Sequence, residues 1–179
     1  MLTAHTYPTP LGPMTALLSG RGLCLLEFVD GTKGLELERV QVEQARGGPP
    51  QPGASALGAQ LGEEIAAYFA GRRRSFDIPL DPVGTPFQLE VWRALLEIPY
   101  GQTRSYAEQA RRIGRPTALR AVAAANGRNK ISIVVPCHRV IGSDGSLTGY
   151  GGGLARKRWL LALERCGVPP GRFEPARAA

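Results

Sequence analysis

Residues 105–127 read Ser105-Tyr-Ala-Glu-Gln-Ala-Arg-Arg-Ile-Gly-Arg-Pro-Thr-Ala-Leu-Arg-Ala-Val-Ala-Ala-Ala-Asn-Gly127. Ser105 and Glu108 have the spacing of a capping box, which predicts a helix that begins there and stops at Gly114. Thr117 is a suitable cap for a second helix, which would run through Asn126. Two short helices joined by a tight turn that contains glycine form the helix-turn-helix pattern. This pattern indicates DNA binding, but helical domains also use such pairs for packing alone, and the residues leave both interpretations open.

The second of these helices carries many alanines and a single long basic side chain, Arg120. A helix of this composition can pack tightly inside a core. Alternatively, a thin exposed helix could approach a nucleic-acid groove, with Arg120 projecting from it. Few of its side chains are long and polar enough to bond to base edges, so recognition would then depend on phosphates and DNA shape.

The charge of the chain is unevenly distributed. The formal net charge is +7 over 179 residues, and it divides into −2 for residues 1–82, +8 for residues 83–168 and +1 for the rest. A basic second half is expected if that half meets phosphates. A solvated, arginine-rich surface fits the same composition equally well.

The first half of the chain has the pattern of a mixed α/β domain. Short strands are predicted over residues 2–7, 14–19 and 23–29, because turn sequences rich in proline and glycine separate these apolar runs. Ser55 can cap a helix that runs to about Ala70. Residues 72–84 include two prolines and form the predicted linker between domains.

Helices dominate after the linker, so the predicted fold class is α+β. Thr85-Pro86-Phe87-Gln88 supplies a cap, a proline at the first helical position and a capping-box glutamine. We expect an N-terminal α/β domain with its linker over residues 1–82 and a mainly helical domain with the helix-turn-helix over residues 83–168. A tail follows over residues 169–179, and we expect it to be frayed from Arg172 onward.

Several classes of protein are disfavoured by composition. No apolar run reaches the length of about 18 residues that spans a membrane, and the first seven residues are not a signal segment, so we expect a cytoplasmic protein with no membrane partner. Three widely spaced cysteines argue for reduced thiols rather than a disulfide framework. Cys24, Cys166 and His5 lack the spacing of a zinc site. We therefore expect no metal and no cofactor.

The segment with the clearest chemistry is Ile131-Ser-Ile-Val-Val-Pro-Cys-His-Arg-Val140. We expect a buried strand that ends at Pro136 and presents Cys137 on rigid backbone. A lone cysteine beside a strand is usually a small buried hydrophobe. His138 follows directly, however, and a histidine near a cysteine can generate a thiolate near neutral pH from a thiol whose ordinary pKa is about 8.5.

These residues resemble the O6-alkylguanine-DNA alkyltransferase family. The resemblance covers residues 86–164 closely and the first half loosely, and it implies a three-stranded, RNase H-like N-terminal domain. The motifs that carry it are Phe87-Gln88, Val91-Trp92, Ile98-Pro99, Gly101, Ser105-Tyr106, Arg120-Ala121-Val122, Asn129, Pro136-Cys137-His138-Arg139-Val140, Gly149-Tyr150, Gly152-Gly153-Leu154 and Lys157.

The resemblance implies a role for each residue of a catalytic centre. Cys137 matches the alkyl acceptor, and His138 matches the base that reaches it through a bound water. Glu164 matches the carboxylate that orients this base, and Asn129 matches the hinge between the helix-turn-helix and the active-site turn. Tyr106 matches the hydroxyl that supports proton transfer to the guanine and crowds the 3′ phosphate.

The resemblance also implies a DNA surface and a pocket for the base. Arg120 matches the finger that fills the space of the extruded nucleotide. The other expected DNA contacts are Ala121, Thr117, Ser105 and Arg139. The expected pocket residues are Tyr150, Gly151 and Val140. Some relatives have a serine where this chain has Gly151, so the pocket of this chain is expected to be more open or less selective.

The implied function is single-turnover repair of DNA. O6-alkylguanine in double-stranded DNA is the expected substrate, with O4-alkylthymine as a second lesion to consider, and transfer to Cys137 is irreversible. The protein is expected to be a monomer, with clustering on DNA as an alternative. Two rival functions are a non-catalytic sensor of alkyl lesions, which Cys137 disfavours, and a cysteine hydrolase, which would turn over many times.

Overall fold

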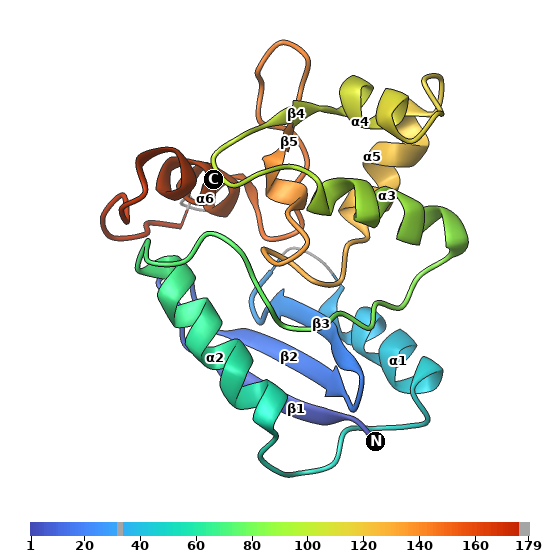
Figure 1. Cartoon of the computed structure of the whole chain (residues 1–179), viewed down its shortest axis with the longest axis vertical. Coiled ribbons are helices and arrows are strands. Elements are labelled where there is room, and N and C mark those ends of the chain that lie inside the picture. The colour runs from blue at the N-terminus through green and yellow to red at the C-terminus, as the bar shows by residue number, and fades with distance from the viewer. Residues whose placement is uncertain (32–33, 176–179) are drawn as a thin grey trace.

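The N-terminal half is built on a small antiparallel sheet. The computed structural model describes residues 1–31 and 34–175. Strands β1 (Thr3–Tyr7), β2 (Met14–Ser19) and β3 (Gly22–Phe28) pair in the order β1-β2-β3, and α2 (Ala56–Phe69) crosses one face (Figure 1). The three strands agree with the predicted ranges to within one residue. Every residue of β3 is buried, so this strand lies at the centre of the structure.

The predicted helices with side-chain caps are confirmed. Ser55 accepts a hydrogen bond from the Gly58 amide and starts α2. Complete capping boxes start α3 (Pro86–Leu96) at Thr85 and α4 (Tyr106–Arg112) at Ser105. These signals are local, since the cap and the amide that it binds lie three residues apart.

The second helix of the helix-turn-helix begins later than predicted. Helix α5 spans Leu119–Gly127, with Ala118 at its cap position and no side-chain cap bond. Thr117 lies in a preceding turn, which is closed by a bond from the Ala118 amide to the Arg115 carbonyl at 2.9 Å. Because Thr117 is inside this turn, it cannot serve as the cap, and that prediction is wrong.

The predicted strand over residues 131–136 is also wrong. Only Ile131 pairs with β3, through a single bridge to Leu26, and the chain then folds into a tight turn. The turn is closed by a bond from the Val135 amide to the Ile131 carbonyl at 3.0 Å, and Ile133 has a positive φ of 72°. A short apolar run can be buried as a turn as readily as a strand, and periodicity alone does not separate the two.

One helix and two short strands lie outside the sequence predictions. Helix α1 (Leu35–Ala45) packs beside β3, but only Val42 is buried, and its Leu-Glu-Leu-Glu start alternates like a strand. Strands β4 (Arg104–Ser105) and β5 (Val140–Ile141) are two-residue segments that pair in parallel. Helix α6 (Leu154–Cys166) closes the C-terminal half.

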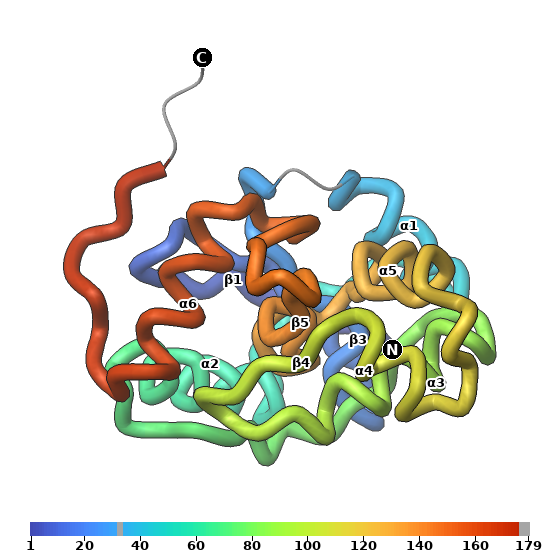
Figure 2. Tube along the Cα trace, turned by 90° about the horizontal axis from the view of Figure 1, so that it is seen from above, coloured from blue at the N-terminus to red at the C-terminus, as the bar shows by residue number. Residues whose placement is uncertain are grey.

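The two halves of the chain are packed closely together. Figure 1 shows the sheet, α1 and α2 on one side and α3, α4 and α5 on the other, with α6 above the C-terminal end of α2. Seen from above in Figure 2, the segment after α6 runs back alongside it. Phe173 in this segment packs against the core, and the Gly171 carbonyl accepts a bond from Trp159. The prediction of a frayed tail from Arg172 onward is therefore wrong for residues 172–175, and residues 176–179 lie outside the described part.

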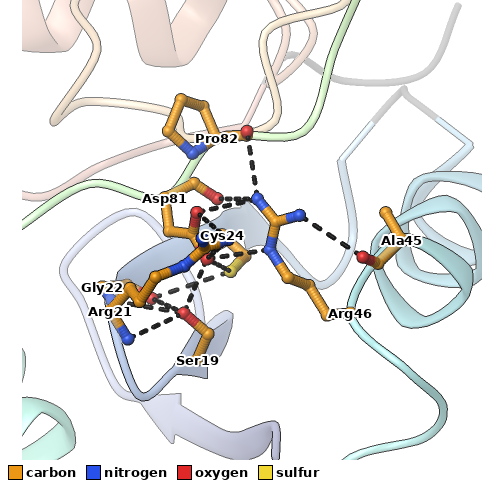
Figure 3. A network of polar contacts seen from close by, with 8 residues as sticks. All are labelled: Ser19, Arg21, Gly22, Cys24, Ala45, Arg46, Asp81 and Pro82. Carbon is orange, nitrogen blue, oxygen red and sulfur yellow. Dashed lines mark hydrogen bonds and ion pairs between the residues drawn. The ribbon is translucent and has the colours of Figure 1, made fainter.

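The linker is bonded to the sheet rather than loose. Asp81 accepts hydrogen bonds from Arg46 at 2.8 Å to each oxygen and from the Ser19 hydroxyl at 2.7 Å (Figure 3). Arg21 reaches the same carboxylate at 3.1 Å, and the Cys24 thiol lies 3.7 Å from it. One carboxylate thus joins the linker to β2, to β3 and to the end of α1.

Asp81→Asn should lower the free energy of unfolding at pH 7 by about 1–3 kcal/mol, because it leaves Arg46 without its charged partner. Burial raises the pKa of Asp81, but bonds from Ser19 and Arg46 outweigh it and lower that pKa overall. The stabilisation is therefore present above about pH 4 and is lost as the pH falls below it. Urea unfolding at pH 7 and pH 3 measures this difference.

Asp77→Asn is the matched control, because Asp77 is an exposed partner of Arg73 and its loss should cost under about 0.5 kcal/mol. Equal losses for the two variants at pH 7 would contradict a special role of Asp81.

Candidate active site

Cys137 faces a pocket in the C-terminal half. It is the first residue of the 3₁₀ turn η1 (Cys137–Arg139) and is 7% exposed. The pocket has a volume of about 600 Å³ and lies between α4, α5 and the loop that precedes α6. Its lining includes the predicted site residues Tyr106, Arg120, Cys137, Tyr150 and Gly151. The sulfur is thus shielded from bulk water but open to a cavity.

Asn129 holds the turn that precedes Cys137. Its buried amide accepts a bond from the Ile131 amide at 3.0 Å and donates to the Val135 carbonyl at 2.8 Å. The same amide nitrogen lies 3.2 Å from Sγ of Cys137. A donor at this position stabilises a thiolate more than a thiol. Asn129 therefore fixes the backbone and favours the ionised sulfur, which is consistent with the predicted hinge.

His138 and Glu164 form a fully buried pair, with His138 Nε2 2.7 Å from Glu164 Oε1. Burial raises the pKa of the carboxyl, but His138 and Arg139 outweigh this effect and hold the pKa of Glu164 well below its usual range. Burial lowers the pKa of His138, and the opposing attraction of Glu164 does not restore it. At neutral pH the pair is therefore a carboxylate and an uncharged imidazole.

This pairing fixes which nitrogen of His138 can accept a proton. An ionised carboxylate only accepts hydrogen bonds, so Nε2 carries the ring hydrogen and Nδ1 carries the lone pair. Nδ1 is buried and has no hydrogen-bond partner among the residues that the structure describes. The imidazole is therefore set up as a base with its lone pair unused.

Arg139, which was expected to contact DNA, lies inside the protein. Its Nε and Nη2 donate to Glu164 at 2.8 and 3.0 Å, and its Nη1 donates to the Ile98 carbonyl at 2.6 Å. The guanidinium is buried and three of its five N–H groups are bonded inside the protein, so it does not face a phosphate. This prediction is corrected: the turn η1 directs Arg139 inward, toward the carboxylate that orients His138.

Lys157 is a functional candidate to which sequence analysis gave no role. Its buried ammonium group donates to the carbonyls of Val140 and Thr148, the second at 2.9 Å, and so ties α6 to the loop before it. Burial lowers the pKa of Lys157 to about 8, and negative charge on Cys137 raises it. A cation here favours the thiolate. Val140 was expected in the pocket, but its side chain is fully buried and it does not line the cavity.

Two tyrosines contribute to the pocket walls. Tyr106 donates a hydrogen bond to the Thr148 carbonyl at 2.9 Å, and burial raises its pKa, so its hydroxyl is protonated at neutral pH. Tyr150 is buried, and burial raises its pKa well above the ordinary value. Gly151 follows it and extends the wall without a side chain.

Arg156 anchors this wall to the N-terminal half, another contact that sequence analysis missed. Its guanidinium donates to the Gly152 carbonyl at 3.0 Å, to the Leu11 carbonyl at 2.9 Å and to Asp30 at 2.6 Å. The same group lies 4.3 Å from the centre of the Phe28 ring. The pocket loop is therefore supported by the sheet domain.

The alanines of α5 divide between two faces. Val122 and Ala125 are buried, whereas Ala121, Ala123 and Ala124 are exposed together with Arg120. The interpretation of α5 as a helix packed entirely in the core is therefore wrong. Thr117 is also exposed, and the Ser105 hydroxyl is used in the cap of α4, where it accepts a bond from the Glu108 amide.

The described ranges, 1–31 and 34–175, contain no helix that is long and apolar enough to cross a membrane. Within the same ranges, no group of three or more His, Cys, Asp or Glu side chains could hold a metal ion.

Comparison with known proteins accounts for both halves of the chain. Residues 2–82 match the family model of the 6-O-methylguanine DNA methyltransferase ribonuclease-like domain, and residues 86–166 match that of the DNA-binding domain of the same proteins. The chain belongs to the 6-O-methylguanine DNA methyltransferase family. Membership agrees with the α+β fold and with the resemblance seen in the motifs around Cys137.

Known members of the family align with this chain over nearly their whole length. A methylated-DNA–protein-cysteine methyltransferase of Mycobacterium tuberculosis is 50% identical over 169 residues, which cover 94% of this chain and 96% of the relative. One of Methanosarcina mazei is 55% identical over 160 residues, 89% of this chain and 95% of the relative. The structure of M. tuberculosis OGT in complex with DNA superimposes with a TM-score of 0.81 at 47% identity, covering 94% and 96% of the two chains.

Lys157→Met should raise the pKa of the Cys137 thiol, because it removes a buried positive charge near the sulfur. In this methyltransferase the rate of S-alkylation by iodoacetamide at pH 7 should fall about 3- to 10-fold at Cys137. Peptide mass spectrometry measures this rate, and the exposed Cys166 of the same molecule is the internal reference. An unchanged ratio of Cys137 to Cys166 labelling would contradict the role given to Lys157.

Proposed function

We propose that this chain repairs double-stranded DNA by transferring the alkyl group of O6-alkylguanine to Sγ of Cys137, once per molecule. The observation that carries the proposal is the position of Cys137, which faces a pocket beside the exposed surface of α5 and directly precedes the buried His138–Glu164 pair. Membership of the methyltransferase family supports the same activity.

The chemistry requires a thiolate and a base that receives its proton. Cys137 loses its proton toward Nδ1 of His138, the nitrogen whose lone pair is unused. Glu164 stabilises the imidazolium that forms, since it already holds the opposite nitrogen. The Asn129 amide and the charge of Lys157 lower the cost of leaving negative charge on sulfur.

The transfer itself is a displacement at the alkyl carbon. A sulfur–carbon bond forms while the bond from that carbon to guanine O6 breaks, and the guanine leaves with the electron pair. Protonation of the departing base lowers the barrier, and Tyr106 is a protonated hydroxyl at the pocket wall that can supply it. His138 and Glu164 offer only proton transfer, which does not cleave the thioether on Cys137, so each molecule acts once.

The lesion must leave the stacked duplex to reach this pocket. Extruding a nucleotide costs a few kcal/mol, and the cost is smallest where damage has already weakened the base pair. Arg120 lies on the exposed side of α5 and also lines the pocket, so it can fill the space that the base vacates. The adjacent Ala121 permits close approach of the helix. Ser105 stands at the start of α4 and Thr117 in the turn before α5, where phosphates would pass.

The basic second half, with its formal charge of +8, suits a DNA backbone. We extend the proposal to a monomer that acts in the cytoplasm and accepts O6-alkylguanine first. O4-alkylthymine and clustering of several molecules on DNA are the extensions to test next. Gly151 supports a tolerant pocket, since it adds no side chain to the wall.

Cys137→Ser should abolish alkyl transfer, because a serine hydroxyl does not ionise near neutral pH, and it should leave DNA affinity within about twofold of the wild type. Intact-mass spectrometry after mixing with O6-methylguanine DNA measures the adduct, and fluorescence anisotropy measures binding. The wild type should gain one methyl group on the Cys137 peptide. Tight binding by the wild type without an adduct would favour a lesion sensor, and repeated turnover would favour a hydrolase.

Arg120→Ala should slow repair of duplex DNA about 10- to 100-fold and change the reaction with free O6-benzylguanine less than about twofold, because only the duplex needs a base to be extruded. Single-turnover rates with both substrates measure the ratio. Arg128→Ala is the matched control, because Arg128 is an exposed arginine that follows the same helix. Equal losses on both substrates would remove Arg120 from base extrusion.

A further inference from the structure

The carboxylate of Glu164 accepts hydrogen bonds from both halves of the protein. Its Oε1 accepts from His138 and from Arg139, and its Oε2 accepts from Arg139 and from the Gly101 amide at 3.2 Å. A further donor to Oε1 is the hydroxyl of Tyr68, at 2.7 Å. Tyr68 stands near the end of α2, in the sheet domain, which Figure 1 shows beneath α6.

The position of the Tyr68 hydroxyl is fixed by packing. The residue is completely buried. Its ring centre lies 5.5 Å from that of Phe69, 5.3 Å from that of Phe76 and 6.1 Å from that of Tyr100. A ring held on several sides cannot turn its hydroxyl away from Glu164 without disturbing the core. The hydrogen bond from Tyr68 to Glu164 is therefore a fixed contact between the two domains.

A neutral donor to a carboxylate has a specific electrostatic effect. It stabilises the ionised form and spreads part of its negative charge, so the carboxylate attracts a neighbouring proton less strongly. His138 shares Oε1 with Tyr68, and the bond from Tyr68 thus weakens the pull of Glu164 on a second proton of the imidazole. Arg139 also donates to this carboxylate, and its positive charge in addition opposes protonation of His138.

We propose that Tyr68 is a positioning residue for the repair reaction: its hydroxyl fixes Oε1 of Glu164 and limits the basicity of the carboxylate, so that His138 stays an uncharged base. The inference rests on the proposed function in assigning His138 as the base. Through Tyr68, the N-terminal domain would help to position the His138–Glu164 pair that receives the proton.

Other charged groups also act on His138 and remain in place in the test. Arg139 and Lys157 oppose its protonation, and Glu164 favours it. The Cys137 thiolate, when formed, raises the pKa of Lys157 and that of Tyr150. Substituting Tyr68 by phenylalanine changes none of these groups and keeps the aromatic packing.

The chain contains only two histidines, His5 and His138, so the imidazoles can be titrated individually by nitrogen-15 NMR. In Tyr68→Phe the titration midpoint of His138 should rise by about half a pH unit or more, because Glu164 regains basicity. Tyr100→Phe is the control, because it removes a neighbouring hydroxyl that donates to the Leu163 carbonyl and not to Glu164. The His138 midpoint should stay within about 0.2 units in this control.

The rate of methyl transfer from O6-methylguanine DNA is measured across the same pH range. Loss of activity toward acid pH should begin at higher pH in Tyr68→Phe and be unchanged in Tyr100→Phe. The inference is overturned if the His138 midpoint of Tyr68→Phe equals that of the wild type, or moves equally in both variants. Absence of a methyl adduct on wild-type Cys137 would instead refute the proposed function, while the NMR midpoints would still test the link from Tyr68 to His138.

Discussion

One buried carboxylate organises the site. Glu164 accepts hydrogen bonds from η1, from the loop after α3 and from α2. Its side chain is buried, so water does not solvate its charge. A buried carboxylate is tolerated only with such a complete set of donors. These donors come from three separate parts of the chain, so the carboxylate forms its full set of bonds only when both halves have folded against each other. The orientation of His138 is a consequence of the whole fold.

The second constraint is the tight turn before Cys137. Ile133 adopts a positive φ that a β-branched residue avoids, and the buried Asn129 bonds across the turn. This conformation is held in place because the surrounding residues are buried and because Ile131 is paired to Leu26 of β3. Strain of this kind is typical where a backbone must present one side chain in a defined direction. Here that side chain is Cys137, the proposed nucleophile.

Local signals made part of this structure predictable. The capped helices α2, α3 and α4 and the three strands follow from residues a few positions apart, and the Cys137-His138 pair is visible in the sequence. The turn at residues 131–136 was predicted as a strand because a short apolar run indicates burial but does not distinguish a buried turn from a buried strand. The burial of Arg139 and the contacts of Tyr68 and Lys157 depend on segments far apart in sequence, so no spacing reveals them.

The exposed face of α5 has a consequence for how a repair protein searches a genome. Its methyl-sized side chains at positions 121, 123 and 124 offer no hydrogen-bonding edge with which to prefer one base pair over another. For a protein whose targets arise at random, this indifference is an advantage, because the proposed contact of α5 with DNA would favour no particular sequence around a damaged guanine.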